Sequence, residues 1–396
     1  MDNWRDSKIE ELCTLHYGKS PKGIDSDDGI YPIYGTGGIV GSTNDYLYDK
    51  PSIILGRKGS IGNIHYVDKP FWTIDTTFYV EAKNCDTKWL YYLFSSLNIE
   101  KLNEATGVPS LSRNNIYAQM LKAPSDQKEQ QKIAEVLSTV DKKIDLIDQK
   151  IAETEKLKTG LMQKLFSEGV GVQDENGNRQ PHTEFQDSPF GKVPKCWLKV
   201  SLENIASVER GKFSARPRND PKYFDGNIPF VQTGDVVNAQ LYVESYNQTL
   251  NELGLTVSKT FPPETILITI AANIGDVAIT QFPLACPDSL VGIQAKKDIC
   301  NSLWLFFFMQ TQKSELDSKA TKSAQKNINL QVLKPLTVFL PSLEEQELIA
   351  EILLASEKKI ALLKQQKAET QQLKKGLMQK LLTGEWRVPV EETEAA

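Results

Sequence analysis

The sequence predicts a duplicated protein in which two mixed α/β (α+β) domains alternate with two long coiled-coil helices. Three observations lead to this prediction. A segment of 37 residues occurs twice without a gap, the apolar residues of both copies follow a heptad pattern, and shorter motifs ahead of each copy correspond in order. Internal similarity of this kind indicates that one structural unit has been duplicated.

The repeated segment covers residues 129–165 and 345–381, and 22 of the 37 aligned positions are identical. Apolar residues recur at alternating steps of four and three, which is the spacing of a coiled-coil seam. Two matching seams in one chain are expected to pack on each other, although two unrelated surface helices would be the alternative. The predicted seam consists of Ile133, Leu137, Val140, Ile144, Ile147 and Ile151 in the first helix and Ile349, Leu353, Ile360 and Leu363 in the second.

The segments ahead of the two helices also correspond. Trp4 matches Trp197, ILGRKGSIGN (54–63) matches ILITIAANIGD (266–276), and WLYYLF (89–94) matches WLFFFM (304–309). Runs such as 52–55, 78–80, 266–271 and 336–340 are rich in apolar residues and predict strands. The two aromatic segments carry apolar side chains on nearly every face, which indicates buried core helices rather than platforms for stacked bases.

These correspondences divide the chain into six segments. We expect a first domain at 1–123, a first helix at 124–167, a surface linker at 168–194, a second domain at 195–340, a second helix at 341–384 and a tail at 385–396. The linker is rich in Gly, Asp, Asn and Pro.

Composition excludes several classes of protein. A net charge of −5 argues against a uniformly basic nucleic-acid binder, so any DNA contact must come from local clusters. The five cysteines contain no CxxC pair and the three histidines are far apart, so neither a disulfide framework nor a metal site is expected. The chain has no apolar run long enough for a membrane span, and its amino terminus is charged. We therefore expect a cytoplasmic protein.

Motifs of nucleic-acid enzymes are missing. The Pro262-Pro263 pair lacks the polar and aromatic neighbours of a methyltransferase loop, GTGGIVG (35–41) does not fit GxGxxG, and no GxxxxGK[ST] motif occurs. Asp75 and Glu81 imitate a nuclease triad, but six residues along one strand separate them by roughly 20 Å. We therefore predict no catalytic residues and no cofactor.

Four phrases resemble those of the DNA-specificity (S) subunits of type I restriction–modification systems. They are GTGGIVG (35–41), GKVPKCW (191–197), PSLEEQELIAEIL (341–353) and LKKGLMQKLLTGEWRV (373–388). The resemblance covers nearly the whole chain in the family's usual order, and the duplicated helical motifs are its most specific part.

This resemblance implies a non-catalytic subunit with two target-recognition domains, each reading one half of a bipartite, asymmetric site in double-stranded DNA. It also implies that the helices form an antiparallel coiled coil with pseudo-twofold symmetry, which sets the separation of the domains. The helices would dock two methyltransferase (M) subunits, to which endonuclease-translocase (R) subunits add. A duplicated domain on a coiled coil independently suits two half-sites at a fixed spacing.

Three alternatives stay open at this point. The chain could be a structural adaptor without DNA contact, a solitary nuclease or methyltransferase, or the specificity subunit of a related single-complex restriction enzyme. The two unlike, loop-rich domains argue against the first alternative, and the missing motifs argue against the second.

Residues that touch DNA should be basic or amide side chains on loops held by a rigid frame. The cluster Arg210, Lys212, Arg216, Arg218 and Lys222 is the densest of these; the further candidates are Lys19, Lys22, Arg57, Lys58, Ser110, Ser112, Arg113, Asn114, Lys322, Gln325, Lys326 and Asn327. A solvated loop is the alternative for each cluster, and it is strongest for Lys19 and Lys22.

Overall fold

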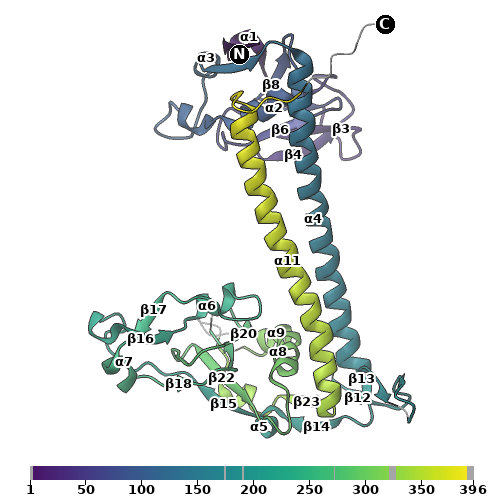
Figure 1. The fold of residues 1–396 in the computed structure, drawn as a ribbon, viewed down its shortest axis with the longest axis vertical. Helices are drawn as coiled ribbons and strands as arrows, with labels where there is room; N and C mark the ends of the chain where they lie inside the picture. The colour runs from purple at the N-terminus through teal and green to yellow at the C-terminus, as the bar shows by residue number, and fades with distance from the viewer. Residues whose placement is uncertain (1–2, 174, 190, 272, 321–326, 390–396) are drawn as a thin grey trace. The chain divides into compact units, whose positions relative to one another are not determined.

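The computed structural model describes residues 3–173, 175–189, 191–271, 273–320 and 327–389. The chain divides into two compact units (Figure 1). The first unit contains Met1–Gln149 and Lys364–Ala396, and the second contains Lys150–Leu363. Each unit therefore combines one globular domain with parts of both long helices.

The globular part of the first unit is built on a four-stranded antiparallel sheet of order β2-β8-β5-β6. A second sheet has the order β4-β3-β7, and β1 pairs with β9. The elements are β1 (Trp4–Lys8), α1 (Ile9–Leu12), β2 (Cys13–Tyr17), β3 (Tyr31–Gly35), β4 (Gly38–Thr43), β5 (Ser52–Gly56), β6 (Ile64–Val67), β7 (Trp72–Thr73), β8 (Thr77–Ala82), α2 (Thr87–Ser96), α3 (Arg113–Tyr117) and β9 (Met120–Pro124).

The second unit repeats this plan with four-stranded sheets β15-β22-β19-β20 and β17-β16-β21-β18 and the pair β14-β23. Its elements are β14 (Leu198–Ser201), α5 (Leu202–Ile205), β15 (Ala206–Arg210), β16 (Phe224–Phe230), α6 (Thr233–Asn238), β17 (Gln248–Leu250), α7 (Glu252–Thr256), β18 (Thr260–Phe261), β19 (Ile266–Thr269), β20 (Val277–Ile279), β21 (Leu284–Ala285), β22 (Leu290–Ala295), α8 (Ser302–Thr311), α9 (Lys313–Lys319), α10 (Leu330–Leu333) and β23 (Thr337–Leu340).

The correspondence of the two sheet orders confirms the prediction of two mixed α/β domains. In both units one aromatic helix lies in the core beside the main sheet: α2 buries Trp89 and Phe94, and α8 buries Trp304 and Phe307. The burial confirms that these aromatic side chains form the core and are not exposed for stacking on bases.

The two long helices are α4 (Gln127–Glu168) and α11 (Leu343–Leu381). In the first unit, Asp141 pairs with Lys374 and Asp148 with Lys367, both at 2.6 Å. In the second unit, Lys158 of α4 pairs with Glu357 of α11. Residue numbers fall on α11 as they rise on α4, so the helices run antiparallel, as predicted.

The predicted seam residues lie at different depths. Fully or nearly fully buried are Ile133, Leu137, Ile147, Ile349, Leu353, Ile360 and Leu363. Val140, Ile144 and Ile151 are partly exposed. α4 begins three residues after the predicted start at 124, because Pro124 belongs to β9, and it ends at Glu168 before Gly169, whose φ of +70° is the left-handed conformation that glycine adopts readily.

A buried glutamate near the start of each long helix ties the helix to its domain. Glu129 accepts hydrogen bonds from Trp4 Nε1 at 3.2 Å and from Arg387 Nε and NH2 at 2.5 and 2.8 Å. The repeat-equivalent Glu345 accepts from Trp197 Nε1 at 2.9 Å and from the Val170 amide at 3.0 Å. The matching tryptophans noted in the sequence thus have the same partner in both units.

The segment 168–194, expected to be a surface linker, contains two short hairpins. These are β10 (Val172–Gln173) with β11 (Arg179–Gln180), and β12 (Phe185–Ser188) with β13 (Gly191–Pro194). Gly177, in the loop of the first hairpin, has a φ of +81°, which glycine adopts readily. Of the helices that the structure describes, none is long and apolar enough to span a membrane.

Candidate nucleic-acid interface

In the first unit, two of the predicted DNA-binding loops lie side by side. Lys58 and Ser110 form a β-bridge. The Gly59 amide donates to the Pro109 carbonyl, and the Leu111 amide donates to the Arg57 carbonyl, both at 2.9 Å. Residues 57–59 and 109–111 therefore form one backbone-linked rim beyond the end of β5.

Tyr17, the last residue of β2, connects this rim to a third segment. Its ring is half exposed, and the Cζ atoms of Arg57 and Arg113 lie 5.2 and 4.3 Å from the ring centroid. Arg57 also donates from NH2 to the Asp75 carbonyl at 2.9 Å. Tyr17, Arg57, Lys58, Ser110 and Arg113 are called the Tyr17 cluster below.

Lys19 and Lys22 follow β2 on an exposed loop next to the Tyr17 cluster. The Lys19 amide donates to the Thr73 carbonyl, and the Lys19 carbonyl accepts from Trp72 Nε1, both at 2.8 Å. Gly18 permits this approach, because a Cβ there would lie 2.0 Å from the Ile74 carbonyl oxygen. The backbone is thereby fixed while both lysine side chains remain exposed.

In the second unit, two of the predicted arginines converge on Asp288. Arg210 Nε donates to the Asp288 carbonyl at 2.6 Å, and Arg218 NH2 donates to the Asp288 carboxylate at 3.0 Å. Arg210 ends β15 as Tyr17 ends β2, and Asp288 precedes β22 as Asp75 precedes β8. Arg210 and Arg218 are called the Asp288 cluster.

The other members of the predicted cluster point in different directions. Arg216 NH1 donates to the carbonyl of its neighbour Ala215 at 2.6 Å, which folds its guanidinium back onto its own loop. Lys222 pairs with Asp220 at 2.9 Å, and this hydrogen bond raises the pKa of Lys222 and lowers the pKa of Asp220. The Lys212 side chain is exposed, while its amide donates to the Cys286 carbonyl.

The remaining candidates flank the start of α3 and its counterpart α10. Ser112 precedes α3 and Asn114 is exposed in its first turn. Asn327 forms a β-bridge with Ala271, as Ser110 does with Lys58. Lys322, Gln325 and Lys326 lie outside the residues that the structure describes.

Equivalent positions in the two units carry unlike side chains. The Leu111 amide donates to Arg57 and the Ile328 amide donates to Ile270, so Ile270 stands where Arg57 does. Leu330 begins α10 as Arg113 begins α3. Cations therefore occupy the β5 end and the α3 start in the first unit, whereas they occupy the β15 end in the second.

Sequence reasoning missed Tyr17 and the role of Asp288. From the sequence, Asp75 was considered together with Glu81 as an apparent nuclease triad, and Asp288 was given no role in binding. In the structure the carbonyl oxygens of both residues accept a guanidinium, and Glu81 pairs with His16 at 2.8 Å. Among the described residues, no three His, Cys, Asp or Glu side chains are grouped to hold a metal ion.

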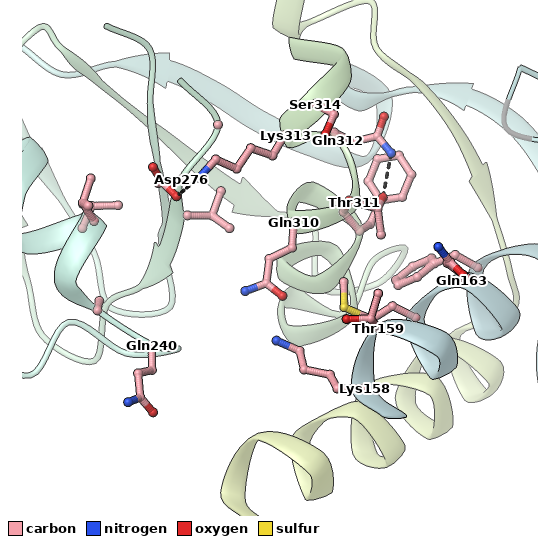
Figure 2. Close-up of a pocket in the computed structure, with 18 of the residues that line it drawn as sticks. Lys158, Thr159, Gln163, Gln240, Asp276, Gln310, Thr311, Gln312, Lys313 and Ser314 are labelled. Carbon is pink, nitrogen blue, oxygen red and sulfur yellow. Dashed lines mark hydrogen bonds and ion pairs between the residues drawn. The ribbon is translucent and has the colours of Figure 1, made fainter. Parts of the chain in front are cut away.

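Each unit also has a groove beside a long helix. The groove of the second unit has a volume of about 910 Å³ and is lined by the end of α4, α6, α8 and α9 (Figure 2). Figure 2 shows Lys158 and Gln310 pointing into the same space, and the ion pair of Lys313 with Asp276 at its edge. The groove of the first unit, about 750 Å³, lies between α2 and the end of α11.

Repeat-equivalent residues line the two grooves. Lys158, Met162 and Gln163 of α4 line one, and Lys374, Met378 and Gln379 of α11 line the other. Both sets fall in or next to the repeated phrase GLMQKL, at 160–165 and 376–381. The two units thus carry the same kind of groove at the same place in the repeat.

Comparison with known proteins gives consistent matches. The family model described as type I restriction modification DNA specificity domain matches residues 1–156 and 194–372. A Methanocaldococcus jannaschii protein named for the specificity subunit of the MjaX type I restriction enzyme is 30% identical over 76% of this chain and 68% of its own length. The MjaVIII specificity subunit from the same organism is 25% identical over 98% of this chain and 94% of its own.

Solved structures agree on the fold. The crystal structure of a type I restriction–modification S subunit from M. genitalium matches with a TM-score of 0.63 at 17% identity, covering 96% of both chains. A second structure, from a study of complex assembly and conformational transition of the type I system, matches with a TM-score of 0.59 at 16% identity.

Proposed function

The chain belongs to the family of type I restriction–modification specificity subunits, and from this premise we propose that its two units each read one half of a bipartite DNA site. The observation that carries the proposal is the pair of arginine-containing clusters, the Tyr17 cluster and the Asp288 cluster. They lie at corresponding ends of the main sheets but are built from unlike side chains. Two domains of the same fold with different DNA-contacting residues suit an asymmetric target.

The long helices act as the spacer between the two readers. An α-helix of 42 residues, such as α4, is roughly 60 Å long at about 1.5 Å per residue. Both readers should face the same side of the duplex, which favours half-site centres about one turn, or 10 base pairs, apart. We expect two specific blocks separated by a non-specific gap of roughly 5–8 base pairs.

The helices also dock two methyltransferase subunits. Four leucines on the long helices are between 54% and 59% exposed, namely Leu146 and Leu373 in the first unit and Leu157 and Leu362 in the second. Leu146 is the repeat equivalent of Leu362, and Leu157 of Leu373. Together with the paired grooves at GLMQKL, they offer the same apolar surface twice, which suits two copies of one partner.

Catalysis in this proposal belongs to the partners. The methyltransferase subunits would supply methyl transfer, and endonuclease-translocase subunits, joining through the complex, would supply cleavage. The specificity chain would need no cofactor of its own, in keeping with the missing methyltransferase and nucleotide-binding motifs.

A domain exchange tests this function. The chain is expressed with a cognate methyltransferase, and genomic methylation is sequenced; the expected motif has two specific blocks around a gap. Replacing residues 1–123 by the first domain of a specificity subunit of known target should change one block and keep the other. A wild-type motif without two blocks, or an exchange that changes both blocks, would contradict the proposal.

A further inference from the structure

Arg113 differs from the other arginines of the candidate interface in having no polar partner. Arg57, Arg210, Arg216 and Arg218 each donate to a carbonyl or carboxylate oxygen. Among the described residues, the Arg113 guanidinium contacts the Tyr17 ring and makes no hydrogen bond or ion pair. Its terminal amino groups are therefore available to an acceptor from outside the chain.

The orientation of this guanidinium is fixed from two sides. Its Nε atom is shielded from solvent, so only the two terminal amino groups can meet a ligand. The guanidinium carbon lies 4.3 Å from the centroid of the Tyr17 ring, and an arginine held against an aromatic ring loses less freedom when it binds than a mobile side chain does. The Arg57 guanidinium, tied to the Asp75 carbonyl, lies against the same ring.

We infer that Arg113 reads a guanine in the half-site of the first unit, with Tyr17 and Arg57 as positioning residues. The inference rests on the proposed function. Two parallel N–H donors match the O6 and N7 acceptors of guanine in the major groove, and this pairing distinguishes guanine from the other bases. Lys58, exposed on the same rim, is suited to a phosphate, which a flexible point charge can contact in any sequence.

The second unit supplies an internal contrast. Leu330 stands at the position of Arg113 and Ile270 at that of Arg57, so the second unit cannot read a base in this way. Recognition through Arg113 is therefore a property of one half-site only.

The test uses the complete complex with its methyltransferase and duplexes that carry the motif found by methylation sequencing. Each guanine of the motif is replaced in turn by 7-deazaguanine, which removes the N7 acceptor. One replacement should weaken binding of the wild type roughly 10-fold or more and leave the binding of Arg113→Ala unchanged. Arg113→Ala and Arg113→Lys should both lose roughly 10- to 100-fold discrimination at that position.

Three further variants separate reading from positioning and from phosphate contact. Tyr17→Phe keeps the ring and should keep discrimination, whereas Tyr17→Leu should reduce it. Lys58→Ala should weaken binding to all sequences alike. Unchanged discrimination at the other block shows that each variant is folded.

Several results would overturn the inference. Arg113→Ala could lower the affinity for all DNA sequences alike, or leave the affinity unchanged. Alternatively, the loss of affinity from Arg113→Ala could add to the loss from each 7-deazaguanine replacement. A wild-type complex without sequence-specific binding would instead refute the proposed function, so the two failures are distinguishable.

Discussion

Replacing Glu345 by alanine should destabilise the second unit strongly. Glu345 is 5% exposed and lies at the start of α11. It accepts from Trp197 Nε1 at 2.9 Å and from the Val170 amide at 3.0 Å, and it lies 2.9 Å from His182 Nε2. The substitution removes the acceptor through which Trp197, Val170 and His182 are held on α11.

The size of the effect follows from these contacts. The buried Trp197 Nε1 and the part-buried Val170 amide lose their acceptor, and each orphaned donor costs about 1–3 kcal/mol. The two losses together give an expected decrease of about 2–6 kcal/mol in the free energy of unfolding. With a urea dependence of about 2 kcal/mol per molar, the midpoint should fall by roughly 1–3 M.

Glu344 provides the matched control. Its side chain is 64% exposed and pairs with Arg179 at 2.7 Å on the surface. Such a pair contributes about 0–1 kcal/mol, so Glu344→Ala should shift the midpoint by less than about 0.5 M.

Urea unfolding of the full chain, read by hydrogen exchange and mass spectrometry, measures the two units separately. Peptides of β14 and β23 report on the second unit, and peptides of β1 and β9 report on the first. Glu345→Ala should lower the protection from hydrogen exchange in the second unit and leave the protection in the first unit unchanged. Equal effects of the Glu344 and Glu345 substitutions, or equal losses in both units, would refute this reasoning.

Three other predictions concern docking, thiol chemistry and spacing. Leu146→Glu with Leu373→Glu should leave one bound methyltransferase subunit in native mass spectrometry; two bound subunits would contradict the docking proposal. Iodoacetamide at pH 8 should label only Cys196, because burial raises the pKa of Cys13, Cys286 and Cys300 to about 12 and of Cys85 to about 11. Burial and Glu345 also raise the pKa of Cys196, so its labelling should accelerate with rising pH; a second adduct on the folded chain would be inconsistent with this. Inserting four residues after Thr154 should lengthen the gap by one or two base pairs, about 6 Å of helix, without changing either block; an unchanged gap in an active complex would exclude the helices as the spacer.

The long helices could be predicted from sequence because their signal is local. A seam residue such as Ile133 is recognised from neighbours three and four positions away, and the same pattern recurs at Ile349. The burial of the aromatic helices was predictable for the same reason, since apolar side chains on every face exclude a surface position.

The grouping of the Tyr17 cluster could not be predicted in this way. Tyr17, Arg57 and Arg113 are distant in sequence. Tyr17 and Arg57 meet because β8 pairs with both β2 and β5, and the bridge between Lys58 and Ser110 brings Arg113 to them. Strand order depends on tertiary packing, which a single sequence does not reveal. Arg57 and Arg113 were identified as separate basic candidates, but the exposed tyrosine between them gave no motif.

Counting charges likewise could not predict how the basic side chains of the second unit are paired. Arg216 and Lys222 are as basic in sequence as Arg210 and Arg218. In the structure Arg216 folds onto a carbonyl of its own loop and Lys222 pairs with Asp220, whereas Arg210 and Arg218 both bond to Asp288. A charge count cannot distinguish a side chain offered to a ligand from one already hydrogen-bonded within its loop.

The pairing of α4 with α11 restricts which insertions and deletions the two long helices can accept. From Asp141 to Asp148 the partner moves seven residues back, from Lys374 to Lys367. One inserted residue would rotate the following part of the helix by about 100° about the helix axis, which would move its buried side chains to the solvent. Four residues turn it by about 40°, and seven by about 20° in the opposite sense. Insertions and deletions of four or seven residues therefore keep the buried side of the helix nearly in place. The distance that the helix pair spans can thus change only in discrete steps.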